Sequence, residues 1–200
     1  DMSGSMMAED FVLKGERVNR LAMAKDVLKI FIEKRPNDRI GLIVFSSQAF
    51  VASPLTLDHD FLQQNLDRLQ LGAIDASKTA IGSGLSTAVN RIRELKSKSK
   101  IVILMTDGQN NAGTIAPLTA AEAAESLKVK VYTIGVGTRG MARSPAGRNP
   151  FTGEMMYHMQ PVDIDEDTLQ KIADKTGGKY YRADNAEKFN AIYDEIDKLE

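Results

Sequence analysis

The sequence predicts a doubly wound α/β fold, in which helices cover both faces of a mainly parallel sheet. Short apolar runs bounded by turn residues alternate with longer segments whose apolar residues recur at helical spacing. Strands that alternate with helices are joined by βαβ crossovers, which place helices on both faces of the sheet. A chain of 200 residues with 42% apolar content suits one domain, which we expect to span residues 1–200.

The expected elements can be placed along the chain. The first helix begins near Asn19 and is ended by Pro36, and the next begins at Asp58, a residue suited to the N-cap. Residues 6–18 show no clear period and are expected to form an irregular loop. Residues 49–52 are expected to pair with the first strand as a short edge hairpin that ends at Pro54. Strands are predicted at 39–45, 101–105, 129–136 and 179–182, and helices at 19–35, 58–69, 80–96, 116–127, 165–176 and 186–199.

Composition argues against several classes of function. The formal net charge is −1 with acidic and basic residues interspersed, so no charged region favours nucleic acid or an anionic membrane surface. The absence of cysteine excludes disulfides and thiolate metal sites in this chain. No stretch of the sequence is long and apolar enough to cross a bilayer.

Oxygen-bearing side chains gather in three short segments. The first five residues place Asp1, Ser3 and Ser5 at alternate positions around a glycine. Thr79 precedes a predicted helix, and Asp107 follows the apolar strand that begins at residue 101. The carboxyl ends of parallel strands meet at one edge of an α/β sheet, so we expect these five side chains to converge there. Oxygen ligands without cysteine or histidine suit Mg²⁺, or else Mn²⁺ or Ca²⁺, better than zinc.

Each segment also has a simpler interpretation. Residues 1–5 could form an ordinary Asx or Ser turn, and Asp107 with Gly108 could form a common strand-exit turn. Thr79 could be the N-cap of the helix that follows it. Lys78 could point to solvent, or it could lie near the metal and either compete with the cation or attract an acidic partner.

Other signals are weaker. The glycines at 135, 137 and 140 match a dinucleotide-binding pattern, but Pro145 and Pro150 prevent the helix that this pattern needs, so we predict no nucleotide binding. His59 and His158 lack a neighbouring nucleophile or metal-ligand spacing, so we predict no enzyme activity. Residues 138–160 are too long for a simple connection and suit a β-hairpin around 149–153. This loop could determine specificity through its Met and Phe side chains, or it could be a variable surface insertion.

The three oxygen-bearing segments resemble the metal-ion-dependent adhesion site of von Willebrand factor type A domains. The matching motifs are Asp-x-Ser-x-Ser at 1–5, the threonine at 79 and Thr-Asp-Gly at 106–108. Residues 35–42, 116–122 and 132–138 are similar to the bacterial membrane-anchored proteins of the Bat aerotolerance group. Lys78 departs from the glycine that is usual in that group. The resemblance covers essentially the whole chain.

The resemblance implies a protein-interaction module. Ser3, Ser5 and Thr79 would be direct neutral ligands, Asp1 and Asp107 would bind the cation directly or through water, and an Asp or Glu of a partner protein would complete the site. The parent protein would be anchored in a bacterial inner membrane, with this domain outside the bilayer in the periplasm. Its partners would be other Bat-like envelope proteins and a MoxR-type AAA+ ATPase, and its role would lie in oxidative-stress tolerance or envelope integrity.

The family also implies a central strand that ends at the motif aspartate. We therefore expect that strand upstream of Asp1, in a longer polypeptide, and a gap in the sheet of this chain where it belongs. The alternative function is a structural assembly domain with a vestigial metal site, which docks through its sheet edge and the loop at 138–160. A Mg²⁺-dependent hydrolase is a third and weaker alternative.

Overall fold

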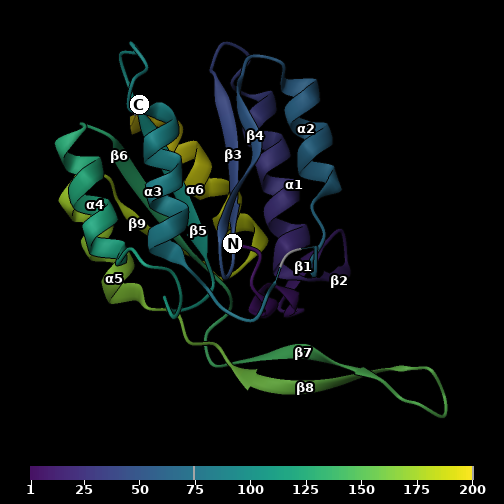
Figure 1. Ribbon diagram of the computed structural model, residues 1–200. Helices are drawn as coiled ribbons and strands as arrows, with labels where there is room; N and C mark the ends of the chain where they lie inside the picture. Colours follow the sequence, from purple (N-terminus) through teal and green to yellow (C-terminus); the bar gives the residue numbers. More distant parts are fainter. Residues whose placement is uncertain (74, 200) are drawn as a thin grey trace.

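The computed structural model of the protein describes residues 1–73 and 75–199 and has the α/β architecture that the sequence predicts (Figure 1). Three parallel strands pair in the order β5–β6–β9, and two antiparallel strands, β3 and β4, lie beside them. The strands of these two sheets are β3 (Ile40–Phe45), β4 (Ala49–Thr56), β5 (Ile101–Thr106), β6 (Lys130–Val136) and β9 (Tyr180–Ala183).

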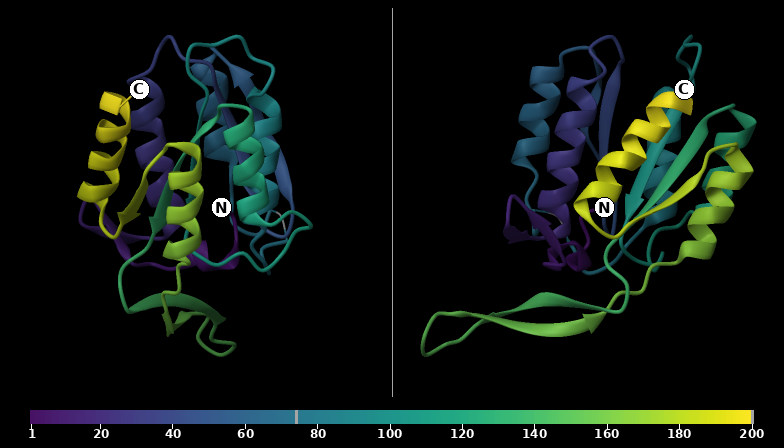
Figure 2. Two further views of the ribbon diagram at one scale, coloured as in Figure 1. Left: turned by 90° about the vertical axis from the view of Figure 1, so that its left-hand side faces the viewer. Right: turned by 180° about the vertical axis from the view of Figure 1, so that it is seen from behind.

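Six helices of the described chain cover the two faces of the sheets (Figure 2). Side chains along β6 point alternately to the two faces of the sheet, so the core has two parts. Tyr132 and Ile134 pack with α1 and α6 on one face. Val131 packs with α3, α4 and α5 on the other face. Helix α2 packs outside this core against α1 and the β3–β4 pair. The helices are α1 (Arg20–Glu33), α2 (His59–Arg68), α3 (Ile81–Ile92), α4 (Pro117–Ser126), α5 (Glu166–Thr176) and α6 (Ala186–Leu199).

The gap expected in the sheet lies between β3 and β5. Within the described residues these two strands do not pair with each other, and a cavity of about 1040 Å³ lies between them. Its lining comes from both strands and from α1, α3 and α6. At its carboxyl end the Asp1 amino group donates to Met105 O at 3.3 Å, and Met2 N–H donates to Phe45 O at 2.7 Å. Asp1 and Met2 therefore bridge the carboxyl ends of β5 and β3.

Two predicted segments differ from the structure. Residues 6–18 are ordered: they contain the end of the 3₁₀-helix η1 (Gly4–Met7) and the hairpin of β1 (Phe11–Leu13) and β2 (Glu16–Val18). The hairpin turn uses left-handed φ angles of 53° at Lys14 and 86° at Gly15, and a lysine at the first position concealed the turn signal. Strand β4 continues past Pro54 to Thr56, because the register with β3 shifts at this point and an irregular edge tolerates proline.

The loop at 138–160 contains the expected hairpin. Strands β7 (Met141–Arg148) and β8 (Met155–Pro161) pair antiparallel, and Asn149 and Glu154 close the turn between them with a backbone hydrogen bond of 2.8 Å. Strand β6 is thus followed by another strand rather than by the helix of a dinucleotide site. Among the described residues, no helix is both long and apolar enough to cross a membrane.

Candidate metal site

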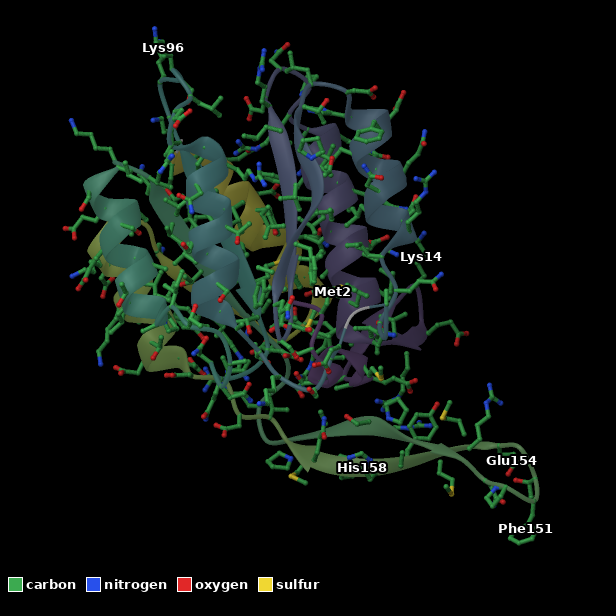
Figure 3. All side chains as sticks on the ribbon, viewed as in Figure 1. Met2, Lys14, Lys96, Phe151, Glu154 and His158 are labelled. Carbon is green, nitrogen blue, oxygen red and sulfur yellow. The ribbon has the colours of Figure 1, made fainter. Side chains whose placement is uncertain are left out.

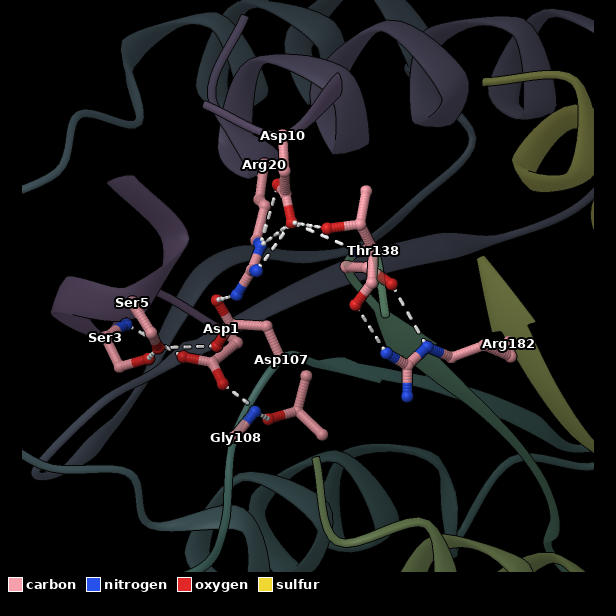
Figure 4. Close-up of polar contacts among 11 residues, drawn as sticks. Asp1, Ser3, Ser5, Asp10, Arg20, Asp107, Gly108, Thr138 and Arg182 are labelled. Carbon is pink, nitrogen blue, oxygen red and sulfur yellow. Dashed lines mark hydrogen bonds and ion pairs between the residues drawn. The ribbon is translucent and has the colours of Figure 1, made fainter. Parts of the chain in front are cut away.

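Four of the five predicted ligands form one hydrogen-bonded group at the carboxyl ends of the strands (Figure 4). The Asp1 carboxylate accepts hydrogen bonds from Ser3 N–H at 2.8 Å and from Thr106 Oγ1 at 2.6 Å, which hold its two oxygens. The Ser3 and Ser5 hydroxyls lie 2.9 Å apart, and Ser5 Oγ donates to Asp107 Oδ1 at 2.6 Å. The first segment and the end of β5 therefore meet, as the sequence predicts.

Thr79, the fifth residue, adjoins this group. A Cβ placed on Gly108 would lie 3.8 Å from Thr79 Oγ1 and 4.0 Å from Ser5 Oγ, so the two hydroxyls flank the same small space. The N-cap of α3 is Ala80 and makes no side-chain capping bond, so the simpler interpretation of Thr79 as the N-cap is wrong. Lys78 is exposed, as its solvent-facing interpretation requires.

Asn111 holds the Thr79 segment in place. Its side-chain Oδ1 accepts a hydrogen bond from Thr79 N–H at 2.7 Å, and its own N–H donates to Thr79 O at 2.9 Å. Sequence reasoning missed this residue. The signal that could have found it is the pair of asparagines that follows the strand-exit turn, because asparagine side chains commonly bond to nearby backbone groups.

Arg20 and Asp10 are further residues that sequence reasoning missed. Arg20 Nη1 lies 2.8 Å from Asp107 Oδ2, and Arg20 Nη2 lies 2.6 Å from Asp10 Oδ2. The Arg20 side chain is 2% exposed and lies at the start of α1. A signal was present in the sequence, since Arg20 falls on the apolar face of the helix at the spacing of Met23 and Val27.

Burial and pairing act in opposite directions on these charges. Burial raises the pKa of the Asp107 carboxyl above its usual value, and the charge of Arg20 and the hydrogen bonds from Ser5 and Arg20 oppose this rise. Burial also disfavours charge on Asp10, but hydrogen bonds and charge from Arg20, with hydrogen bonds from Thr138, outweigh it and hold the pKa of Asp10 below its usual value.

The donor set fits a hard cation. Within the part of the chain that the structure describes, no group of three or more His, Cys, Asp or Glu side chains could hold a metal ion. A cation at this site would therefore depend on the three hydroxyls together with the carboxylates of Asp1 and Asp107. Arg20 engages Oδ2 of Asp107, while Oδ1 accepts a hydrogen bond from the Ser5 hydroxyl. Such a set of neutral and acidic oxygens suits Mg²⁺ and similar ions.

Several solved structures are similar to this chain in fold. An aerotolerance-related membrane protein from Bacteroides fragilis superimposes with a TM-score of 0.78 at 27% identity, over 98% of this chain and 93% of that one. BatB from Bacteroides thetaiotaomicron superimposes with a TM-score of 0.77 at 28% identity, over 99% of this chain and 94% of that one. Proximal thread matrix protein 1 from the mussel byssus, in a structure described as having a zinc-occupied MIDAS motif, shares the fold at 20% identity and a TM-score of 0.62, over 88% and 41%.

Sequence relatives are longer than this chain. A UPF0353 protein from Mycolicibacterium paratuberculosis is 31% identical over 99% of this chain, which spans 58% of the length of that relative. The von Willebrand factor type A domain model matches residues 1–195. The chain therefore belongs to the von Willebrand factor type A domain family.

Proposed function

We propose that this chain is a metal-ion-dependent protein-interaction module. A divalent cation, Mg²⁺ or alternatively Mn²⁺ or Ca²⁺, would be held by Asp1, Ser3, Ser5, Thr79 and Asp107 and would bind a carboxylate of a partner protein. The observation that carries this proposal is the convergence of these side chains from three distant segments on one edge of the sheet. A turn or a helix cap in each segment would not require that convergence.

The chemistry of the residues supports a docking role. Ser3, Ser5 and Thr79 are neutral ligands, and the charge of Asp107 is shared with Arg20, so Asp1 is the one proposed ligand whose negative charge is not shared with Arg20 and the cation keeps part of its charge. The remaining positive charge of a bound metal ion would attract a carboxylate of the partner as a further ligand. The mussel byssus protein, which has the same fold, supports the capacity of such a motif to hold a divalent ion.

The relatives suggest the setting. The Bacteroides fragilis protein is described as an aerotolerance-related membrane protein, and the second Bacteroides protein is BatB. We propose that the parent of this chain is a Bat-like protein anchored in a bacterial inner membrane, with this domain in the periplasm. Other Bat-like envelope proteins and a MoxR-type AAA+ ATPase are the proposed partners, and oxidative-stress tolerance or envelope integrity is the proposed process.

Calorimetric titration of Mg²⁺ and Mn²⁺ tests the site. We expect binding by the unmodified chain, a loss of affinity of at least about tenfold in Thr79→Ala and Ser5→Ala because each removes one ligand oxygen, and unchanged binding in Ser77→Ala, an exposed neighbour of the motif. A folded protein that binds neither ion would instead support the assembly domain with a vestigial site. Phosphatase turnover that Thr79→Ala abolishes would support the hydrolase and contradict our proposal of a non-enzymatic module.

A further inference from the structure

Strand β8 is an open edge. It pairs with β7 on one side, and within residues 1–73 and 75–199 no strand pairs with its other side. The outer side of β7 lies against the body of the protein, where Glu9 N–H donates to Arg143 O at 2.7 Å. The views agree that the hairpin projects past the carboxyl edge of the sheet, with β8 on the side away from the body (Figures 1 and 2). The outer backbone groups of β8 are therefore available.

The composition of β8 does not protect this edge. Exposed edge strands usually carry charged residues, prolines or bulges that prevent pairing with another chain. The seven residues Met155–Pro161 contain no Asp, Glu, Lys or Arg, and the proline stands at the end. Four large side chains of this strand are 37–58% exposed, namely Met155, Met156, Tyr157 and Met159. Long open edges of this kind are templates for strand addition.

Arginines of β7 accompany these side chains. Arg143 pairs across the hairpin with Met159, and Arg148 pairs with Met155. The Arg143 guanidinium also lies 3.5 Å from the centre of the Tyr157 ring. Opposite residues of an antiparallel pair share a face, so this face of the hairpin alternates methionine and tyrosine with positive charge. Methionine adapts to varied apolar partners, and arginine pairs with carboxylates.

The charge of the hairpin indicates the kind of partner. Residues 139–160 contain three arginines and one acidic residue, Glu154, within a chain whose formal net charge is −1. Arg139 and Arg143 each lie 4.0 Å from a carboxylate of the body, Glu166 and Glu9, but their side chains are 71% and 40% exposed and so remain accessible to a further carboxylate. Glu154 and the exposed Phe151 lie at the far end of the hairpin, and His158 lies along β8 (Figure 3). A second copy of the hairpin would bring the same positive charges together, whereas an acidic segment would be attracted.

We propose that the outer edge of β8 binds an extended, acidic segment of a partner polypeptide by β-strand addition. Backbone hydrogen bonds to β8 provide the pairing, while the methionine, tyrosine and arginine side chains favour a segment that alternates apolar and acidic residues. This inference deepens the proposed function by assigning a second contact to the acidic partner. The contact itself does not require the cation, so it can be tested separately.

Synthetic peptides provide the test. A peptide that alternates valine and glutamate and one that alternates valine and lysine are added to the protein in EDTA, and binding is measured by fluorescence anisotropy and amide hydrogen exchange. We expect the glutamate peptide to bind and to slow exchange in residues 155–161, and the lysine peptide not to bind. Met155→Glu/Met159→Glu should weaken binding at least about tenfold, through repulsion and lost apolar contact.

A matched control separates the edge from general charge effects. Leu118→Glu/Leu127→Glu adds the same two charges at positions on and just after α4 that are each 38% exposed, and it should leave peptide binding unchanged. Thermal unfolding checks that both double variants remain folded. Unchanged exchange at 155–161 with the glutamate peptide would overturn the proposal. Concentration-dependent self-association that protects β8 without peptide would also overturn it, in favour of a second copy.

The two proposals fail differently. A protein that captures the glutamate peptide in EDTA but binds neither Mg²⁺ nor Mn²⁺ would contradict the metal site and leave the β8 edge supported. A protein that binds Mg²⁺ but shows no protection of β8 would contradict the edge and leave the metal site supported.

Discussion

Arg20 and Asp107 are 87 positions apart in the sequence and form a buried ion pair of 2.8 Å at the candidate metal site, where Asp107 is a proposed ligand. The same guanidinium binds Asp10, whose carboxylate accepts a hydrogen bond of 3.0 Å from Thr138 N–H at the base of the β7–β8 hairpin. The Asp107 carboxylate at the metal site and the Asp10 carboxylate at the hairpin base are therefore both paired with the Arg20 guanidinium. Loss of that guanidinium would leave both carboxylates buried without their main partner.

We predict that Arg20→Met lowers the free energy of unfolding by about 3–5 kcal/mol, because removing one member of a buried charge group leaves the others unpaired. Chemical denaturation measures the change. The control is Arg93→Met, which removes an ion pair to Glu94 whose two side chains are 50% and 84% exposed, and which should change stability by about 0.5 kcal/mol or less. Equal effects of the two substitutions would contradict the role of Arg20.

Millimolar Mg²⁺ should stabilise Arg20→Met more than the unmodified protein, since the bound metal ion would replace part of the lost positive charge.

Asp10 should give stability a pH dependence. Its pKa in the folded protein lies below the value of about 3.9 for an unfolded aspartate. The unfolded chain therefore binds the proton more readily, so the contribution of Asp10 is fully present above about pH 3.9 and is lost as the pH falls through that value towards the folded pKa. Urea midpoints of the unmodified protein and of Asp10→Asn should differ at pH 7 and converge towards pH 3. A difference that stays constant over this range would show that Asp10 does not act through its charge.

The cavity between β3 and β5 should accept an added strand. We predict that an apolar extension of about five residues, joined before Asp1, raises the melting temperature, because it pairs with two open strand edges and buries apolar surface. Hydrogen exchange should slow in β3 and β5 together. An extension of equal length made of glycine and serine is the control and should have little effect. If both extensions raise the melting temperature equally, strand pairing in the cavity is not the cause of the stabilisation.

Gly82 should be intolerant of a side chain. A Cβ at this position would lie 1.9 Å from the backbone oxygen of Ile115, so α3 and the segment before α4 would have to separate. We predict that Gly82→Ala destabilises the protein by about 1–3 kcal/mol, although alanine is the better helix former by roughly 1 kcal/mol. Thermal unfolding measures this, with Ser86→Ala on the same helix as the control. A stabilised Gly82→Ala variant would mean that helix propensity outweighs the close contact.

Much of the fold could be predicted from local patterns. Asp58 caps α2 by accepting a hydrogen bond from Phe61 N–H at 2.9 Å, as its position before an apolar helical pattern indicates. The hairpin at 11–18 was missed, because its left-handed turn begins with a lysine, which carries no turn signal. The length of β4 was also missed, since the register shift that accommodates Pro54 depends on the partner strand.

The features of the candidate site also fall into two groups, those that local sequence predicts and those that only tertiary packing sets. The sequence by itself determined the donor types and their place at strand ends and helix starts, because turn chemistry and periodicity act over a few residues. The tertiary structure decided that Arg20 neutralises Asp107, that Asn111 holds Thr79, and that the outer edge of β8 stays unpaired among the described residues. These relationships join residues far apart in the chain, and they depend on how the helices and strands pack rather than on any local pattern.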